Sequence, residues 1–186
     1  MENILIVLKS KPFQDRFLEL VLLHKSIYSK VKIKAEMFEE ILYKSLCKIS
    51  NNVVWNYNSH MTGVDIVFEG VRISCKSGKI TKNKLKYSGS RTTTYKSIKD
   101  KVSFLSNNHE DIIVFLAEQN GMYHLYTIPS SFIIFGSPEE WKEDMKKWKR
   151  VDGYLSMSIN KSMSDQLWVE IDLEKICANP IMSITI

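Results

Sequence analysis

The segment 111–117 constrains the fold of this chain more than any other, because every residue in it after Asp111 is apolar. A continuous apolar run of this length, bounded by polar residues, is typical of a strand that is buried on both faces. Gly121 then indicates a turn, and 123–128 predicts a second strand. The sequence therefore predicts a sheet with at least one strand in its interior.

The remaining segments alternate between helical and strand-like patterns. Helices are predicted at 13–30, 34–49, 95–106 and 139–149, the last with Pro138 before it and acids in its first turn. Strands are predicted at 64–68, 71–76 and 167–173. The polar segment 77–95 predicts a loop. This order favours a mixed α/β fold, and we expect a single domain over 1–186.

Charge and cysteine content narrow the class of protein. Lys and Arg number 26 against 21 Asp and Glu, which gives +5. This charge is compatible with a polyanionic partner and equally with a Lys-rich surface. Three widely spaced cysteines argue against a disulfide framework and a zinc knuckle, and we expect a cytoplasmic protein. We see no secretory leader and no stretch long enough to span a membrane.

A predicted hairpin around Glu69-Gly70 carries most of the chemical information. A two-residue turn there places apolar pairs on one face: Phe68 with Val71, Ile66 with Ile73, and Val64 with Cys75. A register slip of one residue would turn the charged residues into the core.

The other face of this hairpin carries Asp65 opposite Ser74, with Lys76 one step diagonally beyond. Phosphodiester hydrolysis uses such a set: a carboxylate holds Mg²⁺, and a lysine orients the attacking water and stabilises developing charge. An ordinary surface ion pair has the same composition, so spacing alone leaves both interpretations open.

The segment resembles the PD-(D/E)xK nuclease superfamily, which includes most type II restriction endonucleases. Asp65 matches the first acid, and Ser74-Cys75-Lys76 matches the acid-x-Lys triplet, with Ser in place of the acid and Val64 in place of the usual Pro. The resemblance implies a restriction-endonuclease-like core, a mixed central β-sheet flanked by helices. It also implies Mg²⁺-dependent DNA cleavage with Asp65, Ser74 and Lys76 in the site.

The Ser74 substitution leaves the expected metal site one carboxylate short. In relatives a Glu on an early helix reaches the metal, and Glu39 lies at the border of the apolar stripe of 34–49. Glu39 is therefore the first candidate for a catalytic and metal-binding acid, and an ordinary border residue is the alternative. Glu118 is a second candidate. Glu69 is disfavoured, because four strand residues separate it from Asp65 by roughly 13 Å.

The basic segment that follows Lys76 is the expected DNA-binding surface. Its candidate phosphate contacts are Lys79, Lys82, Lys84, Lys86 and Arg91. A solvated Lys-rich loop is the alternative. His60, a few residues before the hairpin, could line the cleft or play a structural part.

The chain as a whole is similar to the small catalytic subunit of heterodimeric type IIS restriction endonucleases. The resemblance implies cleavage of one strand of double-stranded DNA, with recognition supplied by a larger subunit. Two alternatives stay open: a homodimeric restriction enzyme or junction resolvase using the same residues, and a catalytically silent DNA-binding or assembly subunit.

Overall fold

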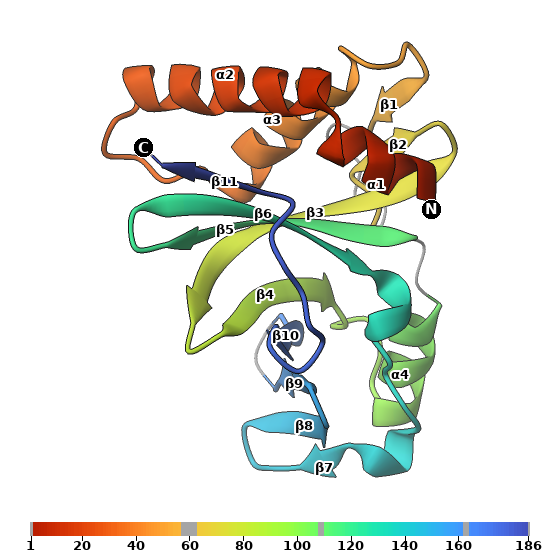
Figure 1. The fold of residues 1–186 in the computed structure, drawn as a ribbon. Coiled ribbons are helices and arrows are strands. Elements are labelled where there is room, and N and C mark those ends of the chain that lie inside the picture. The colour runs from red at the N-terminus through yellow and green to blue at the C-terminus, as the bar shows by residue number, and fades with distance from the viewer. Residues whose placement is uncertain (1, 57–62, 108–109, 162–163, 186) are drawn as a thin grey trace.

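A computed structural model describes residues 2–56, 63–107, 110–161 and 164–185. A helical layer is formed by α1 (Glu2–Lys9), α2 (Lys11–Ile27) and α3 (Ala35–Leu46). It covers one face of a first sheet, and a second sheet lies on the other side, as Figure 1 shows.

The first sheet is mixed. Its strands are β1 (Val53–Trp55), β2 (Ile66–Phe68), β3 (Val71–Thr81), β5 (Ile112–Gln119), β6 (Met122–Pro129) and β11 (Met182–Thr185). Strand β3 pairs antiparallel with β2 on one edge and parallel with β5 on the other, and β5, β6 and β11 pair antiparallel.

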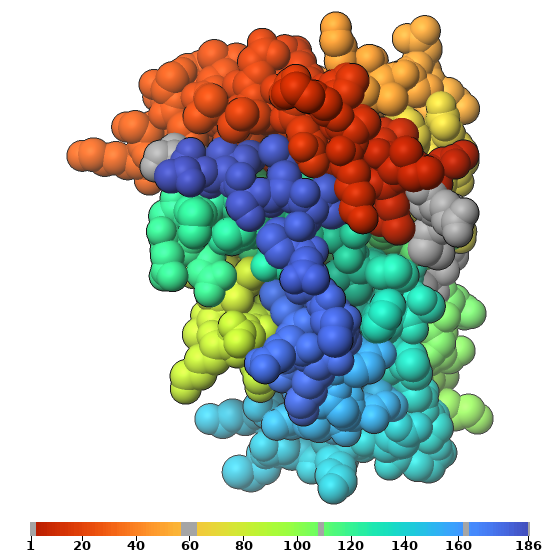
Figure 2. Space-filling model, viewed as in Figure 1, coloured from red at the N-terminus to blue at the C-terminus, as the bar shows by residue number. Residues whose placement is uncertain are grey.

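The second sheet is antiparallel and begins where the end of β3 pairs with β4. Its further strands are β4 (Lys84–Arg91), β10 (Gln166–Asp172), β9 (Leu155–Asn160), β8 (Lys147–Asp152) and β7 (Lys142–Glu143), in that spatial order. Helix α4 (Ile98–Ser106) connects β4 to β5. The C-terminal segment crosses one side of the molecule from the second sheet to the first (Figure 2).

Two apolar cores result from this layering, and β5 contributes to both. Ile112, Val114 and Leu116 pack against the helical layer, whereas Ile113 and Phe115 pack between the sheets. Alternate side chains of a strand point to opposite faces, so a strand covered on both sides must be apolar throughout. The prediction of a buried strand at 111–117 is confirmed.

Several other predictions are confirmed. The fold is mixed α/β, with a large mixed sheet flanked by helices. The hairpin has the expected register over the three residues of β2, with Ile66 opposite Ile73 and Phe68 opposite Val71, whereas the predicted pair Val64 and Cys75 lies beyond the paired residues. The helices predicted at 13–30, 34–49 and 95–106 occur as α2, α3 and α4.

The prediction of a loop over 77–95 is wrong, because β3 continues to Thr81 and β4 returns from Lys84. Lys82 and Asn83 form the turn with φ of 51° and 58°, the left-handed values that two-residue hairpin turns require. Leu85 and Tyr87 are buried, while Lys84 and Lys86, which alternate with them, are exposed. The sequence of β4 resembles that of a loop because its outward-facing residues include lysines, although its inward-facing residues are buried.

The prediction of a helix over 139–149 is also wrong. Pro138–Glu140 form one 3-10 turn, closed by a reciprocal Ser137–Glu140 capping box, and the chain then enters β7 and β8. The Pro and the acids therefore start a helical turn that does not continue. Arg150, only 4% exposed, donates hydrogen bonds to Glu140 and Asp152, and so connects β8 with this turn.

Several further elements were not predicted, among them α1, β1, β9 and β11. The apolar run near the N-terminus is a helix whose Ile4 and Leu8 are buried against α2 and the sheet. Among the described residues, no helix is both long and apolar enough to cross a membrane.

The strand assignment of 84–91 can be tested by truncating its inward side chain. Leu85 is fully buried between the sheets. We expect Leu85→Ala to lower the free energy of unfolding by about 2–5 kcal/mol, as for other buried leucines. The outward neighbour is the control, since Lys86→Ala should change it by less than about 0.5 kcal/mol. If urea denaturation shows the same small change in the free energy of unfolding for both variants, the assignment of 84–91 as a strand is contradicted.

Candidate active site

The hairpin β2–β3 fixes the position of the Asp65 carboxylate. The backbone N–H of Asp65, the residue just before β2, donates to the carbonyl of Ile73 on β3 at 2.9 Å. Asp65 Oδ2 accepts hydrogen bonds from the backbone N–H of Cys75 at 2.6 Å and from Ser74 Oγ at 3.3 Å. Among the described residues, the hydrogen bonds to this carboxylate all end on Oδ2, so Oδ1 is available for another ligand.

Lys76 lies beside this carboxylate, as the sequence predicted. Its Nζ is 3.7 Å from Asp65 Oδ2 and donates to the carbonyl of Cys75 at 3.1 Å. The side chains of Lys76 and Asp65 are 23% and 25% exposed. Partial exposure keeps both groups reachable from solvent while limiting their hydration.

Helix α3 carries Glu39 near enough to this pair for their charges to interact. Burial of the half-buried Glu39 raises its pKa, the negative charge of Asp65 raises it further, and Lys76 and a hydrogen bond with Trp55 lower it. Glu39 is therefore within electrostatic reach of both Asp65 and Lys76, on the border of the buried face where its helical position predicted it.

Ser74 and Cys75 of β3 are the buried neighbours of Asp65, Lys76 and Glu39. Ser74 is 1% exposed and its hydroxyl donates to Asp65, so it acts as a positioning residue for that carboxylate. Burial and the charges of Asp65 and Glu39 raise the pKa of the Cys75 thiol well above its usual range. Cys75 is thus a protonated core residue rather than a nucleophile.

The other acids considered from the sequence lie elsewhere. Glu118 is opposite Lys79 at the far end of β3 and forms an ion pair with Lys32 at 2.6 Å. Its pairing position is five residues along the strand from Ser74, and Glu69 lies exposed in the hairpin turn. Of the candidates, Glu39 is the acid that joins Asp65 and Lys76. His60 lies outside the described residues.

The donor set fits a magnesium ion of the kind that keeps most of its water. Within the described parts of the chain, no three His, Cys, Asp or Glu side chains converge as a ready-made metal cage. Mg²⁺ commonly uses one or two carboxylates and retains several waters. Asp65 and Glu39 supply two, and the unfavourable interaction between them that raises the pKa of Glu39 would be relieved by a cation.

A cavity of about 200 Å³ between the two sheets adjoins this cluster. Ser74, Lys76 and Glu110 line it together with Tyr87 and apolar residues of both sheets. The sequence did not single out Glu110, because it lies just before a buried strand beside another acid and no pattern separates the two. In the structure Asp111 pairs with Arg72, whereas Glu110 faces the cavity.

The predicted DNA-binding residues do not form one surface next to Lys76. Lys79 is exposed on β3 and Lys82 lies in the following turn. Lys84 and Lys86 are on the outer face of β4, opposite to Tyr87, which faces the cavity. Arg91 is at the end of that strand, where its Nε donates to Gln166.

Comparisons of this chain with protein-family models, with curated proteins and with solved structures found no match. The interpretation of the site therefore depends on its own geometry and on the residues that the sequence pattern selected.

The raised pKa of Glu39 predicts a pH-dependent effect on stability. A carboxyl whose pKa is higher in the folded state favours folding below its unfolded pKa, and this contribution is lost as pH rises through the folded value. We therefore expect Glu39→Gln to unfold at a higher temperature than the wild type at pH 7–8 in EDTA, with the gain shrinking as pH falls towards 4.

Glu40→Gln is the matched control on the same helix, because Glu40 pairs with Lys44 at 2.6 Å near solvent. It should show no such gain at neutral pH. A Glu39→Gln protein that is less stable than wild type at every pH would contradict the electrostatic placement of Glu39.

Proposed function

We propose that this chain is a Mg²⁺-dependent DNA endonuclease subunit that hydrolyses one strand of duplex DNA. The observation that supports this most is the convergence of Asp65, Lys76 and Glu39 from the β2–β3 hairpin and α3, with Lys76 Nζ 3.7 Å from Asp65 Oδ2. Two acids and a lysine in one partly exposed cluster suit phosphodiester hydrolysis better than they suit a stabilising ion pair, since Glu39 is electrostatically unfavourable there.

Each residue of the cluster has a distinct part in this proposal. Asp65 and Glu39 would hold Mg²⁺, which when bound lowers the pKa of a coordinated water and polarises the phosphate. The Lys76 ammonium donates hydrogen bonds that orient the attacking water and stabilise negative charge on the phosphate oxygens. Ser74 and the Cys75 N–H keep Asp65 from rotating away, so the carboxylate is oriented before the substrate arrives.

Recognition of the DNA sequence belongs, in this proposal, to a larger partner subunit. This part is based on the resemblance to small subunits of heterodimeric type IIS restriction endonucleases. A homodimeric restriction enzyme or a junction resolvase would use the same three residues, and the substrate that is cut distinguishes these enzymes from one another. The cytoplasmic location also stays a prediction.

Removal of either principal group should abolish cleavage. We expect Asp65→Asn and Lys76→Met to slow plasmid nicking by at least about 100-fold, the usual contribution of a positioned acid–base or charge-stabilising group. The measurement is conversion of supercoiled plasmid in Mg²⁺ by the chain purified from its native host together with any larger subunit bound to it. EDTA should have the same effect on the wild type.

Glu118→Gln is the control, because Glu118 lies outside the cluster and should leave the nicking rate unchanged. If Asp65→Asn and Lys76→Met complexes cut as fast as the wild type, the catalytic proposal fails. The chain would then be a non-catalytic DNA-binding or assembly subunit.

A further inference from the structure

The outer face of the second sheet is polar and basic. Inward residues such as Leu155, Met157 and Val169 are buried in the core between the sheets. The alternate residues point outward: Lys84 and Lys86 on β4, Trp168 and Glu170 on β10, Ser156 and Ser158 on β9, and Lys147 and Lys149 on β8.

Strand register places Trp168 in the middle of this face. Trp168 is opposite Ser158, and Ser158 is opposite Lys149 on the next strand. On the other side, Lys86 Nζ is 5.5 Å from the centroid of the Trp168 ring. The indole is half-exposed, although most aromatic residues of the second sheet face the core.

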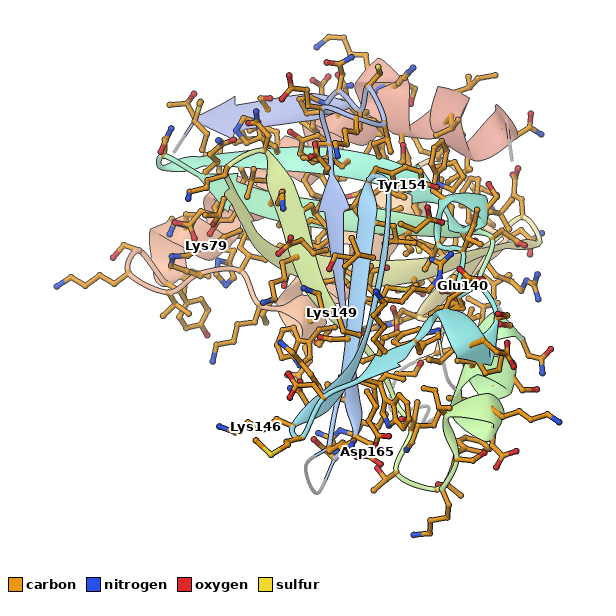
Figure 3. All side chains as sticks on the ribbon, turned by 90° about the horizontal axis from the view of Figure 1, so that it is seen from below. Lys79, Glu140, Lys146, Lys149, Tyr154 and Asp165 are labelled. Carbon is orange, nitrogen blue, oxygen red and sulfur yellow. The ribbon has the colours of Figure 1, made fainter. Side chains whose placement is uncertain are left out.

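The face is also hollowed around the indole. A depression of about 180 Å³ is lined by Lys86, Lys147, Lys149, Ser156, Ser158, Trp168, Val169 and Glu170. Glu170 forms an ion pair with Lys84 at 3.1 Å, which leaves the other three lysines in excess. Lys149 lies alongside β9, and Lys146 lies at the end of the β7–β8 hairpin (Figure 3).

We propose that this face binds a single-stranded nucleic acid, with one base stacked on Trp168 and the flanking phosphates on Lys86, Lys147 and Lys149. An aromatic platform between lysines is what sequence-independent recognition of a single strand requires, because every unpaired base has a π-face. The serine hydroxyls add hydrogen bonds to the backbone. A duplex keeps its bases stacked inside and would use the lysines but not the indole.

This surface is separate from the proposed active site. Lys76 lines the cavity between the sheets together with Tyr87, which points inward from β4, whereas Lys86 points outward from the same strand. Binding here therefore requires neither Mg²⁺ nor Asp65, and it stands whether or not the chain cuts DNA.

The test is binding of a fluorescent oligothymidylate of about 12 nucleotides to the full chain in EDTA, measured by anisotropy. We expect Trp168→Ala to weaken binding about 10-fold and Trp168→Phe to restore most of it, since phenylalanine can also stack. The double variant Lys147→Glu/Lys149→Glu should make the fall of log affinity with log salt less steep by about 1.4. This corresponds to the loss of two phosphate contacts that contribute about 0.7 each.

Lys30→Glu with Lys48→Glu gives the same change of net charge from exposed lysines in the turns that follow α2 and α3, and should leave the slope unchanged. Asp65→Asn should bind like the wild type. A Trp168→Phe protein no better than Trp168→Ala, a slope unaffected by the Lys147 and Lys149 changes, or tighter binding of a duplex of equal length would each overturn the proposal.

Discussion

Strand β3 has to satisfy hydrogen bonds in two sheets, and the rest of the structure depends on this. Its first part pairs with β2 and β5, and its last residues pair with β4. Gly78 lies where the strand passes from one sheet to the other. A Cβ there would be 3.0 Å from the Lys86 carbonyl and 3.1 Å from the Phe115 ring, so glycine lets β4 cross this closely without a shift of these neighbours. One strand thus carries the candidate active site at its start and leads into the basic hairpin at its end.

In the candidate active site, hydrogen bonds fix the orientation of one carboxylate, and the other carboxylate lies where its negative charge is unfavourable. Asp65 is oriented by the Cys75 N–H and the Ser74 hydroxyl, both supplied by the ladder of the hairpin. Glu39 comes from a different layer, and its raised pKa reflects partial burial next to another carboxylate. The packing of α3 on the sheet, through Phe38 and Leu42, holds Glu39 where its charge is disfavoured. Such tension between stability and placement is common where a protein binds a cation or performs chemistry.

The basic residues serve two separated surfaces because a strand has two faces. Alternation along β4 sends Tyr87 into the cavity that Lys76 lines and sends Lys86 to the outer face beside Trp168. Linear proximity to Lys76 therefore does not bring these lysines next to the proposed scissile phosphate. The outer face gains its character from β8 and β10, which lie far along the chain from β4.

Local sequence patterns were sufficient to predict contacts between residues that are close to each other in the sequence. Period-two alternation around Glu69-Gly70 determined the register that joins Asp65, Ser74 and Lys76, and helical periodicity determined that Glu39 borders a buried face. Tertiary structure decided which acid joins Asp65, because this depends on how α3 packs on the sheet. It also decided that 77–91 contains strands, since Leu85 pairs with Ile171 only after distant segments meet. Long-range pairing outweighs local propensity, and no short stretch of sequence records it.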